Sequence, residues 1–211
     1  MHPKGNPNMT LETPPLEQAA EIQSAVKSKY RKVAASPEGH FGYTVGKESA
    51  LKLGYDPALF KVVPGEAIDR FVGVGNPFKV RAPKPGDRVL DAGCGCGFDT
   101  FVAGSLTGPS GKAIGIDITA EMLAVARSAA GKYNSGNVEF REGPLEKLPF
   151  DDSSFDLVIS NGVLNLVPDK NAAFAEIARV LRPEGVLAAA DLLVIETIPP
   201  EVLANTDAWS T

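Results

Sequence analysis

Cysteine and histidine are scarce in this chain of 211 residues, which contains two of each. Cys94 and Cys96 are separated by one residue in a glycine-rich loop, where they are poorly placed to form a disulfide with each other. They are too few for a structural zinc site, and neither His2 nor His40 stands at ligand spacing. We therefore predict no metal site. We interpret both cysteines as small residues that fill a tight loop, with a redox or soft-metal role as the alternative.

Long apolar runs and an excess of positive charge are also absent. No run is long enough to cross a bilayer, and the first residues lack the apolar core of a secretion signal. The net charge of −5 gives no basic face for nucleic acid. We therefore expect a cytoplasmic protein that binds neither membranes nor nucleic acid.

One stretch, residues 89–99, organises the rest of the chain. A short apolar run ends in Asp91, three alternating glycines follow, and a helical pattern begins at about Phe98. Glycines let the backbone approach a ligand without a Cβ in the way, and the first N–H groups of a helix suit a phosphate or a carboxylate. A strand, a glycine loop and a helix in this order predict the ligand-binding corner of a doubly wound α/β sheet.

Beyond this loop, strand and helix patterns alternate. We expect helices at 119–133 and 169–182, and strands at 88–90, 112–118, 138–142, 155–160 and 186–195. Strands that alternate with helices of this length indicate a parallel sheet with right-handed crossovers. The predicted fold class is therefore α/β, with a Rossmann-like, doubly wound and mostly parallel sheet.

We divide the chain into three parts. Residues 1–15 are rich in Pro, Gly, Asn and Thr without an apolar period, which predicts a disordered tail. Residues 16–80 begin with an amphipathic helix that ends near Ser36 and continue with short helical stretches, which predicts a helical cap on the substrate side. Mere packing against the core is an equally good explanation of this cap. Residues 81–211 form the predicted cofactor-binding core.

Two acids suggest the ligand. Asp117 ends the second predicted strand, where an acid in this architecture accepts hydrogen bonds from ribose hydroxyls. Asp91 is placed to meet a positive group such as an ammonium. Asp117 taken alone could equally be a helix cap. Together with the anion-binding loop, the two acids describe an amino acid joined to a nucleoside, and S-adenosylmethionine has that form.

The spacing of the motif identifies a family. The glycines follow D-x-G-x-G-x-G, and Phe98 stands where a dinucleotide fingerprint would have its last glycine. This pattern resembles the first motif of class I S-adenosylmethionine-dependent methyltransferases, and residues 137–143, 148–149 and 156–161 look like later motifs of that class. Three further runs, 75–77, 158–170 and 179–183, resemble the arsenite methyltransferase branch.

The resemblance implies S-adenosylmethionine as cofactor and assigns its methionine end. Gly93, Gly95 and Gly97 would cradle the methionine part, with Asp91 near its amino group. Asn161 would border the pocket in which the methyl group is transferred.

The resemblance also assigns the adenosine end. Asp117 would hold the ribose, Ile118 would touch the adenine, and Leu145 would face the adenine edge through its backbone N–H. Pro144 stands where relatives carry an acid near the adenine amino group, so cofactor affinity is expected to be weaker.

Arsenite is disfavoured as substrate because the arsenic-binding thiolates of that branch are not matched. Soft As(III) is bound by cysteines. This chain has Val74 and Gly162 at two of those positions, and the third would lie beyond Thr211.

The predicted fifth strand would be an exposed edge. The class I sheet usually ends with an antiparallel pair that covers this strand, and the chain ends before such a pair. We expect that the sequence is a fragment, or that a second copy or another protein covers the edge.

The sequence thus predicts a methyltransferase that acts on a small-molecule acceptor by in-line displacement, in which the cofactor carries the chemistry. Catalytic residues stay unassigned. His40 and Tyr43 are candidates in the cap, although surface or packing roles explain them better. The alternatives are a non-catalytic cofactor-binding or scaffold protein and an inactive fragment. An arsenite methyltransferase and a nicotinamide-dependent oxidoreductase rank below these.

Overall fold

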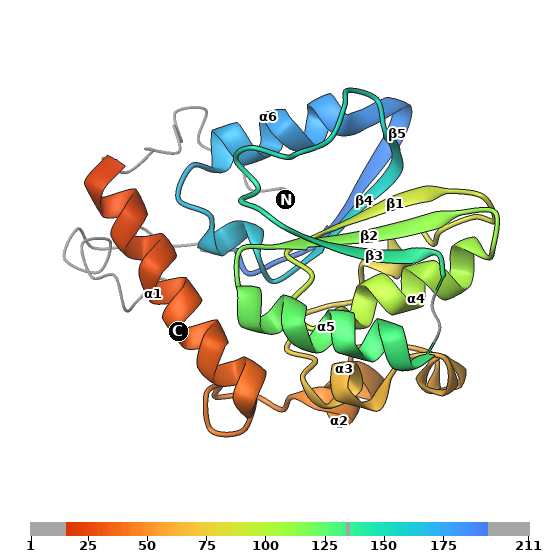
Figure 1. Ribbon diagram of the computed structural model, residues 1–211, viewed down its shortest axis with the longest axis horizontal. Helices are drawn as coiled ribbons and strands as arrows, with labels where there is room; N and C mark the ends of the chain where they lie inside the picture. The colour runs from red at the N-terminus through yellow and green to blue at the C-terminus, as the bar shows by residue number, and fades with distance from the viewer. Residues whose placement is uncertain (1–15, 134–135, 194–211) are drawn as a thin grey trace, which may run out of the picture.

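A parallel sheet of five strands forms the centre of the computed structural model, which describes residues 16–133 and 136–193 (Figure 1). The strand order is β3-β2-β1-β4-β5, and all four neighbouring pairs are parallel. The strands are β1 (Arg88–Ala92), β2 (Lys112–Asp117), β3 (Val138–Glu142), β4 (Phe155–Asn161) and β5 (Leu181–Ala190). The order reverses between β1 and β4, which places a ligand crevice at their carboxyl ends. The predicted fold class is confirmed.

Helices cover both faces of the sheet. α4 (Phe98–Thr107) and α5 (Ala120–Tyr133) lie on one face, and α6 (Lys170–Val180) lies on the other (Figure 1). Phe101 and Leu123 are buried beneath α4 and α5, whereas Phe155 and Ile177 are buried beneath α6. None of the described helices combines the length and the hydropathy that crossing a bilayer requires. The predicted tail, residues 1–15, lies outside the described residues.

The segment before the sheet is helical, as its pattern predicted. It contains α1 (Leu16–Ala35), α2 (Gly46–Lys52), α3 (Gly65–Asp69) and the 3-10 turns η1 (Pro57–Lys61) and η2 (Pro77–Lys79). α1 packs beside α5, where Arg31 forms an ion pair with Glu121 at 2.8 Å. Arg70 donates from Nε to the Ala34 carbonyl oxygen at 2.7 Å. These contacts hold α1 against the carboxyl edge of the sheet.

The predicted boundary between α6 and β5 is wrong. α6 ends at Val180, and β5 begins directly at Leu181 rather than at residue 186. Pairing with β4 then shifts register between Phe155 and Leu157, where Glu184 takes a left-handed φ of 67°. The Pro-Glu-Gly run therefore forms a bulge inside the strand instead of a helix end. Among the described strands, β5 pairs with β4 alone. The last two residues of the predicted strand, 194–195, lie outside the described residues.

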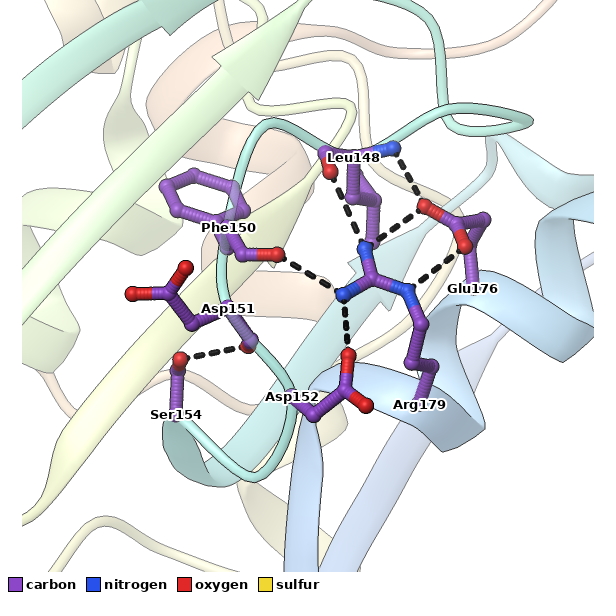
Figure 2. A network of polar contacts seen from close by, with 7 residues as sticks. All are labelled: Leu148, Phe150, Asp151, Asp152, Ser154, Glu176 and Arg179. Carbon is purple, nitrogen blue, oxygen red and sulfur yellow. Dashed lines mark hydrogen bonds and ion pairs between the residues drawn. The ribbon is translucent and has the colours of Figure 1, made fainter.

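Arg179 of α6 fixes the loop that joins β3 to β4 (Figure 2). Its Nη2 donates to the Leu148 carbonyl oxygen at 3.1 Å, and its Nη1 donates to that of Phe150 at 2.8 Å. Nη1 and Nε also form ion pairs with Asp152 and Glu176, each at 2.7 Å. The Glu176 Oε2 atom accepts from the Leu148 N–H at 2.7 Å. One guanidinium thus ties the loop, which contributes to the pocket described next, to the core.

Candidate functional site

A pocket opens at the carboxyl ends of β1, β2 and β4, with α1 as part of its wall. Seven of the eight residues predicted to bind the cofactor line this pocket, namely Asp91, Gly93, Gly95, Asp117, Ile118, Leu145 and Asn161. Residues that are distant in sequence are thus brought together where a doubly wound sheet binds its ligand.

The three glycines of the loop have different surroundings. A Cβ on Gly93 would overlap the Val163 side chain, so glycine is needed for Val163 to lie this close to the backbone of the loop. Gly95 takes a left-handed φ of 50°, which favours glycine, and a Cβ there would meet nothing within 4 Å, so this turn faces open space. Gly97 does not line the pocket. It takes a left-handed φ of 88°, and a Cβ there would lie 2.6 Å from the Phe140 ring, so packing accounts for this glycine.

Two predicted acids accept hydrogen bonds only from neutral groups. Asp91, which is buried, accepts from the Thr100 hydroxyl at 2.6 Å. Asp117 accepts from the backbone N–H groups of Gly95 at 2.9 Å and Thr119 at 2.8 Å. Asp117 is therefore bonded to the turn that faces open space, and it links the glycine loop to the end of β2.

A third acid, Asp99, was not predicted from the sequence. It lies in the first turn of α4, lines the pocket and is only 6% exposed. It accepts from the Tyr55 hydroxyl at 2.6 Å and from Asn161 Nδ2 at 3.0 Å. Asn161 Oδ1 in turn accepts from the backbone N–H groups of Val74 at 2.9 Å and Gly75 at 3.0 Å. Asn161 therefore joins Asp99 to the segment before the sheet.

The pocket carries uncompensated negative charge. No basic side chain of the described residues forms a hydrogen bond or an ion pair with Asp91, Asp99 or Asp117. Burial raises the pKa of all three carboxyl groups, that of Asp99 to about 6. The one basic residue in the described lining is Arg70, which donates to backbone carbonyl oxygens. The arrangement therefore favours a ligand that carries positive charge.

α1 contributes three residues to the pocket, Gln23, Val26 and Tyr30. Gln23 Nε2 donates to Glu146 Oε1 at 3.2 Å, which connects α1 to the loop after β3. Burial raises the pKa of the Tyr30 hydroxyl, which is therefore a neutral hydroxyl beside the ligand space. The sequence showed these residues only as part of an amphipathic helix, which gave no signal for a role in a site.

The two candidates from the cap do not line the pocket. His40 forms no wall of it, and the Tyr43 hydroxyl donates to the Val72 carbonyl oxygen at 3.3 Å. Tyr43 also packs against Phe41 with 5.1 Å between ring centroids. Tyr43 is 45% exposed, so the structure favours the surface or packing role that the sequence suggested for it.

Both cysteines are buried in the glycine loop. Cys96 Sγ lies 3.1 Å from Met122 Sδ, and Cys94 Sγ lies 3.7 Å from the Gly95 carbonyl oxygen. Burial raises the pKa of both thiols, that of Cys96 to about 12, so both are protonated at neutral pH. Across the described residues no group of three His, Cys, Asp or Glu side chains is arranged to hold a metal ion.

Comparison with known proteins gives consistent matches. The family model described as a methyltransferase domain matches residues 83–210. An arsenite methyltransferase of Halobacterium salinarum is 37% identical over 202 residues, which is 89% of this chain and 51% of that protein. A demethylmenaquinone methyltransferase of Lactobacillus johnsonii is 38% identical over 109 residues, 51% of this chain and 45% of that protein.

A solved structure agrees with these matches. The crystal structure of an arsenic(III) S-adenosylmethionine methyltransferase from Chlamydomonas reinhardtii superposes with a TM-score of 0.65 at 40% identity. The match covers 71% of this chain and 53% of that one. The chain thus spans about half the length of the Halobacterium salinarum protein and of the Chlamydomonas reinhardtii structure.

Proposed function

Because the chain belongs to the class I S-adenosylmethionine-dependent methyltransferases, in their arsenite methyltransferase-like branch, we propose that it transfers a methyl group from S-adenosylmethionine to a small organic acceptor. The observation that carries the cofactor assignment is the set of three pocket aspartates, Asp91, Asp99 and Asp117, which have no basic partner among the described residues and lie beside a glycine turn that faces open space. S-adenosylmethionine brings two positive groups, an ammonium and a sulfonium, to such a site.

The residues of the pocket fit the parts of the cofactor. Asp91 would meet the ammonium, and the open turn at Gly95 leaves room for the methionine part. Asp117 would accept hydrogen bonds from the ribose, while Ile118 and the Leu145 backbone would border the adenine. When bound, the cofactor supplies an activated methyl group, and the protein's part is to position it and to exclude water.

The apolar part of the pocket lining supports an organic acceptor. Val163, Leu166 and Val167, which follow β4, line the pocket, as does Val26 of α1. Val163 also covers the glycine loop at Gly93. These apolar side chains suit a carbon skeleton, and the Lactobacillus johnsonii relative is named for an organic acceptor, demethylmenaquinone. Both cysteines also line the pocket from the glycine loop, but their thiols are buried and protonated, which disfavours them as As(III) ligands.

The test is transfer of a labelled methyl group from S-adenosylmethionine to two sets of acceptors. The first set contains hydroxyquinones and catechols, and the second is As(III) with a thiol reductant. We expect label in the organic products only. Label that enters arsenic alone would overturn the proposed acceptor class, and a folded protein that binds no cofactor would overturn the proposal as a whole.

A further inference from the structure

Asp99 differs from the other two aspartates of the described pocket because no part of the cofactor has been matched to it. It directly follows Phe98 at the start of α4, and its carboxylate is buried against the pocket. The Tyr55 hydroxyl and Asn161 Nδ2 hold its two oxygens in place, one each. The position of the charge is therefore fixed before any ligand binds.

The charge of Asp99 is compensated by nothing else in the described pocket. Its two partners, Tyr55 and Asn161, are neutral donors. The Arg70 guanidinium, the one basic group among the described lining residues, is directed to the carbonyl oxygens of Ala34, Ala35 and Glu66. A buried carboxylate that has only neutral partners is stabilised by any positive charge that enters the pocket.

The cofactor and its product differ by one charge. S-adenosylmethionine carries a sulfonium, whereas S-adenosylhomocysteine has an uncharged thioether at the same atom. The ammonium, carboxylate, ribose and adenine are common to both, so Asp91 and Asp117 meet groups that the two ligands share. Two carboxylates of the described lining then have no counterpart, Asp99 and Glu146. Glu146 accepts a hydrogen bond from Gln23 of α1, whereas Asp99 directly follows the glycine loop at the start of α4. A sulfonium beside Asp99 would lose its charge when the methyl group leaves.

We propose that Asp99 makes the pocket selective for the positively charged cofactor over the uncharged product, and thereby promotes product release. This inference rests on the proposed function, since it takes S-adenosylmethionine as the ligand. A full charge in a partly enclosed site changes affinity by at least about tenfold, because the attraction between two unit charges a few ångströms apart is weakly screened there.

The experiment is calorimetric titration of the full chain with three ligands at neutral pH. These are S-adenosylmethionine, S-adenosylhomocysteine and sinefungin, which carries an ammonium-bearing carbon in place of the sulfonium. In the unmodified protein we expect the two cationic ligands to bind about tenfold or more tighter than S-adenosylhomocysteine. Equal affinities, or tighter binding of the product, would overturn the proposal.

Three variants locate the effect. Asp99→Asn preserves the size of the side chain and removes its charge, so the preference for cationic ligands should fall to about one. Tyr55→Phe removes the 2.6 Å hydrogen bond but leaves the charge, so the preference should persist. Asp152→Asn, at a carboxylate whose side chain is 76% exposed, is the control and should leave the preference for cationic ligands unchanged.

The outcomes separate the two proposals. A preference that survives in folded Asp99→Asn overturns the role of Asp99 while leaving the cofactor assignment intact. Failure of all three ligands to bind the unmodified protein contradicts the proposed function itself. Should Asp99→Asn not fold, the comparison of sinefungin with S-adenosylhomocysteine in the unmodified protein carries the test, and equal binding of the two overturns the inference.

Discussion

A Cβ atom on Gly162 would lie 3.2 Å from Cγ1 of Val74, so these two positions face each other although one precedes β1 and the other follows β4. By resemblance, both carry cysteines in the arsenite-methylating branch, where neighbouring thiolates bind soft As(III). In this chain the contact is a valine against a glycine. The two thiols that this chain lacks would therefore have lain side by side in one site.

Restoring both thiols should restore arsenic binding. We expect the double variant V74C/G162C to bind phenylarsine oxide tightly, because the two new side chains would lie close enough to share one arsenic. The unmodified protein, whose cysteines are buried and protonated, should not bind it, and neither should either single variant. Mass spectrometry of the intact protein would measure the adduct. Equal labelling of the unmodified protein would contradict this reading.

The same substitution at Gly162 should carry a cost in stability. Gly162 has a φ of 71°, a region that side-chain-bearing residues enter at about 1–2 kcal/mol. We therefore expect Gly162→Cys alone to lower the melting temperature by several degrees, while Val74→Cys lowers it less. Differential scanning fluorimetry compares the two, and a larger loss for Val74→Cys would argue against backbone strain at Gly162.

Asp117→Ala should weaken cofactor binding by about ten- to a hundredfold, the range for loss of hydrogen bonds to a charged group. The alanine removes the acceptor for the ribose and for the Gly95 and Thr119 N–H groups. Ala120→Ser, at an exposed residue next to these groups, is the matched control and should leave affinity unchanged. Undiminished binding by a folded Asp117→Ala protein would remove this residue from the site.

The stability of the ligand-free protein should increase as pH falls from about 7.5 to about 5.5. Burial raises the pKa of Asp99 to about 6, so the folded state binds this proton more tightly than the unfolded state. The resulting destabilisation has its full value above the folded pKa of about 6 and declines as pH falls below it toward the unfolded pKa. Over this interval Asp99 alone accounts for about 1 kcal/mol, or roughly 2–4 °C in melting temperature.

Two comparisons check this pH dependence. Asp99→Asn should flatten it, and saturating S-adenosylmethionine should oppose it, because positive charge in the pocket favours the ionised carboxylate. Acids whose pKa is lowered, such as Glu139 and Glu176, change their protonation state only below this pH interval, so they do not contribute to the expected trend. A melting temperature that falls steadily between the same two pH values would contradict the proposed state of the pocket.

Arg179→Lys should destabilise the fold although it keeps the charge. The guanidinium reaches the carbonyl oxygens of Leu148 and Phe150 and the carboxylates of Glu176 and Asp152 at once, a geometry that an ammonium cannot reproduce. We expect a loss of about 1–3 kcal/mol in the free energy of unfolding. Asp152→Asn, at an exposed partner, should cost much less. Equal losses in urea unfolding would show that the backbone contacts contribute little.

Sequence reasoning succeeded where the signal was local. The alternation of strands and helices predicted the parallel sheet, and D-x-G-x-G-x-G predicted the corner where Asp91 and Gly95 line the pocket. It failed for Asp99, because the partner Tyr55 lies 44 residues away and no pattern links the two. The predicted start of β5 was wrong for another reason. Pro-Glu-Gly usually ends a helix or a strand, whereas here it forms a bulge within a strand.

Binding of S-adenosylmethionine tests the central claim most directly. Isothermal titration of the purified chain should show one site of micromolar or tighter affinity for S-adenosylmethionine and no binding of NADH under the same conditions. A folded protein that binds NADH, or that leaves S-adenosylmethionine unbound at millimolar concentration, would contradict the account.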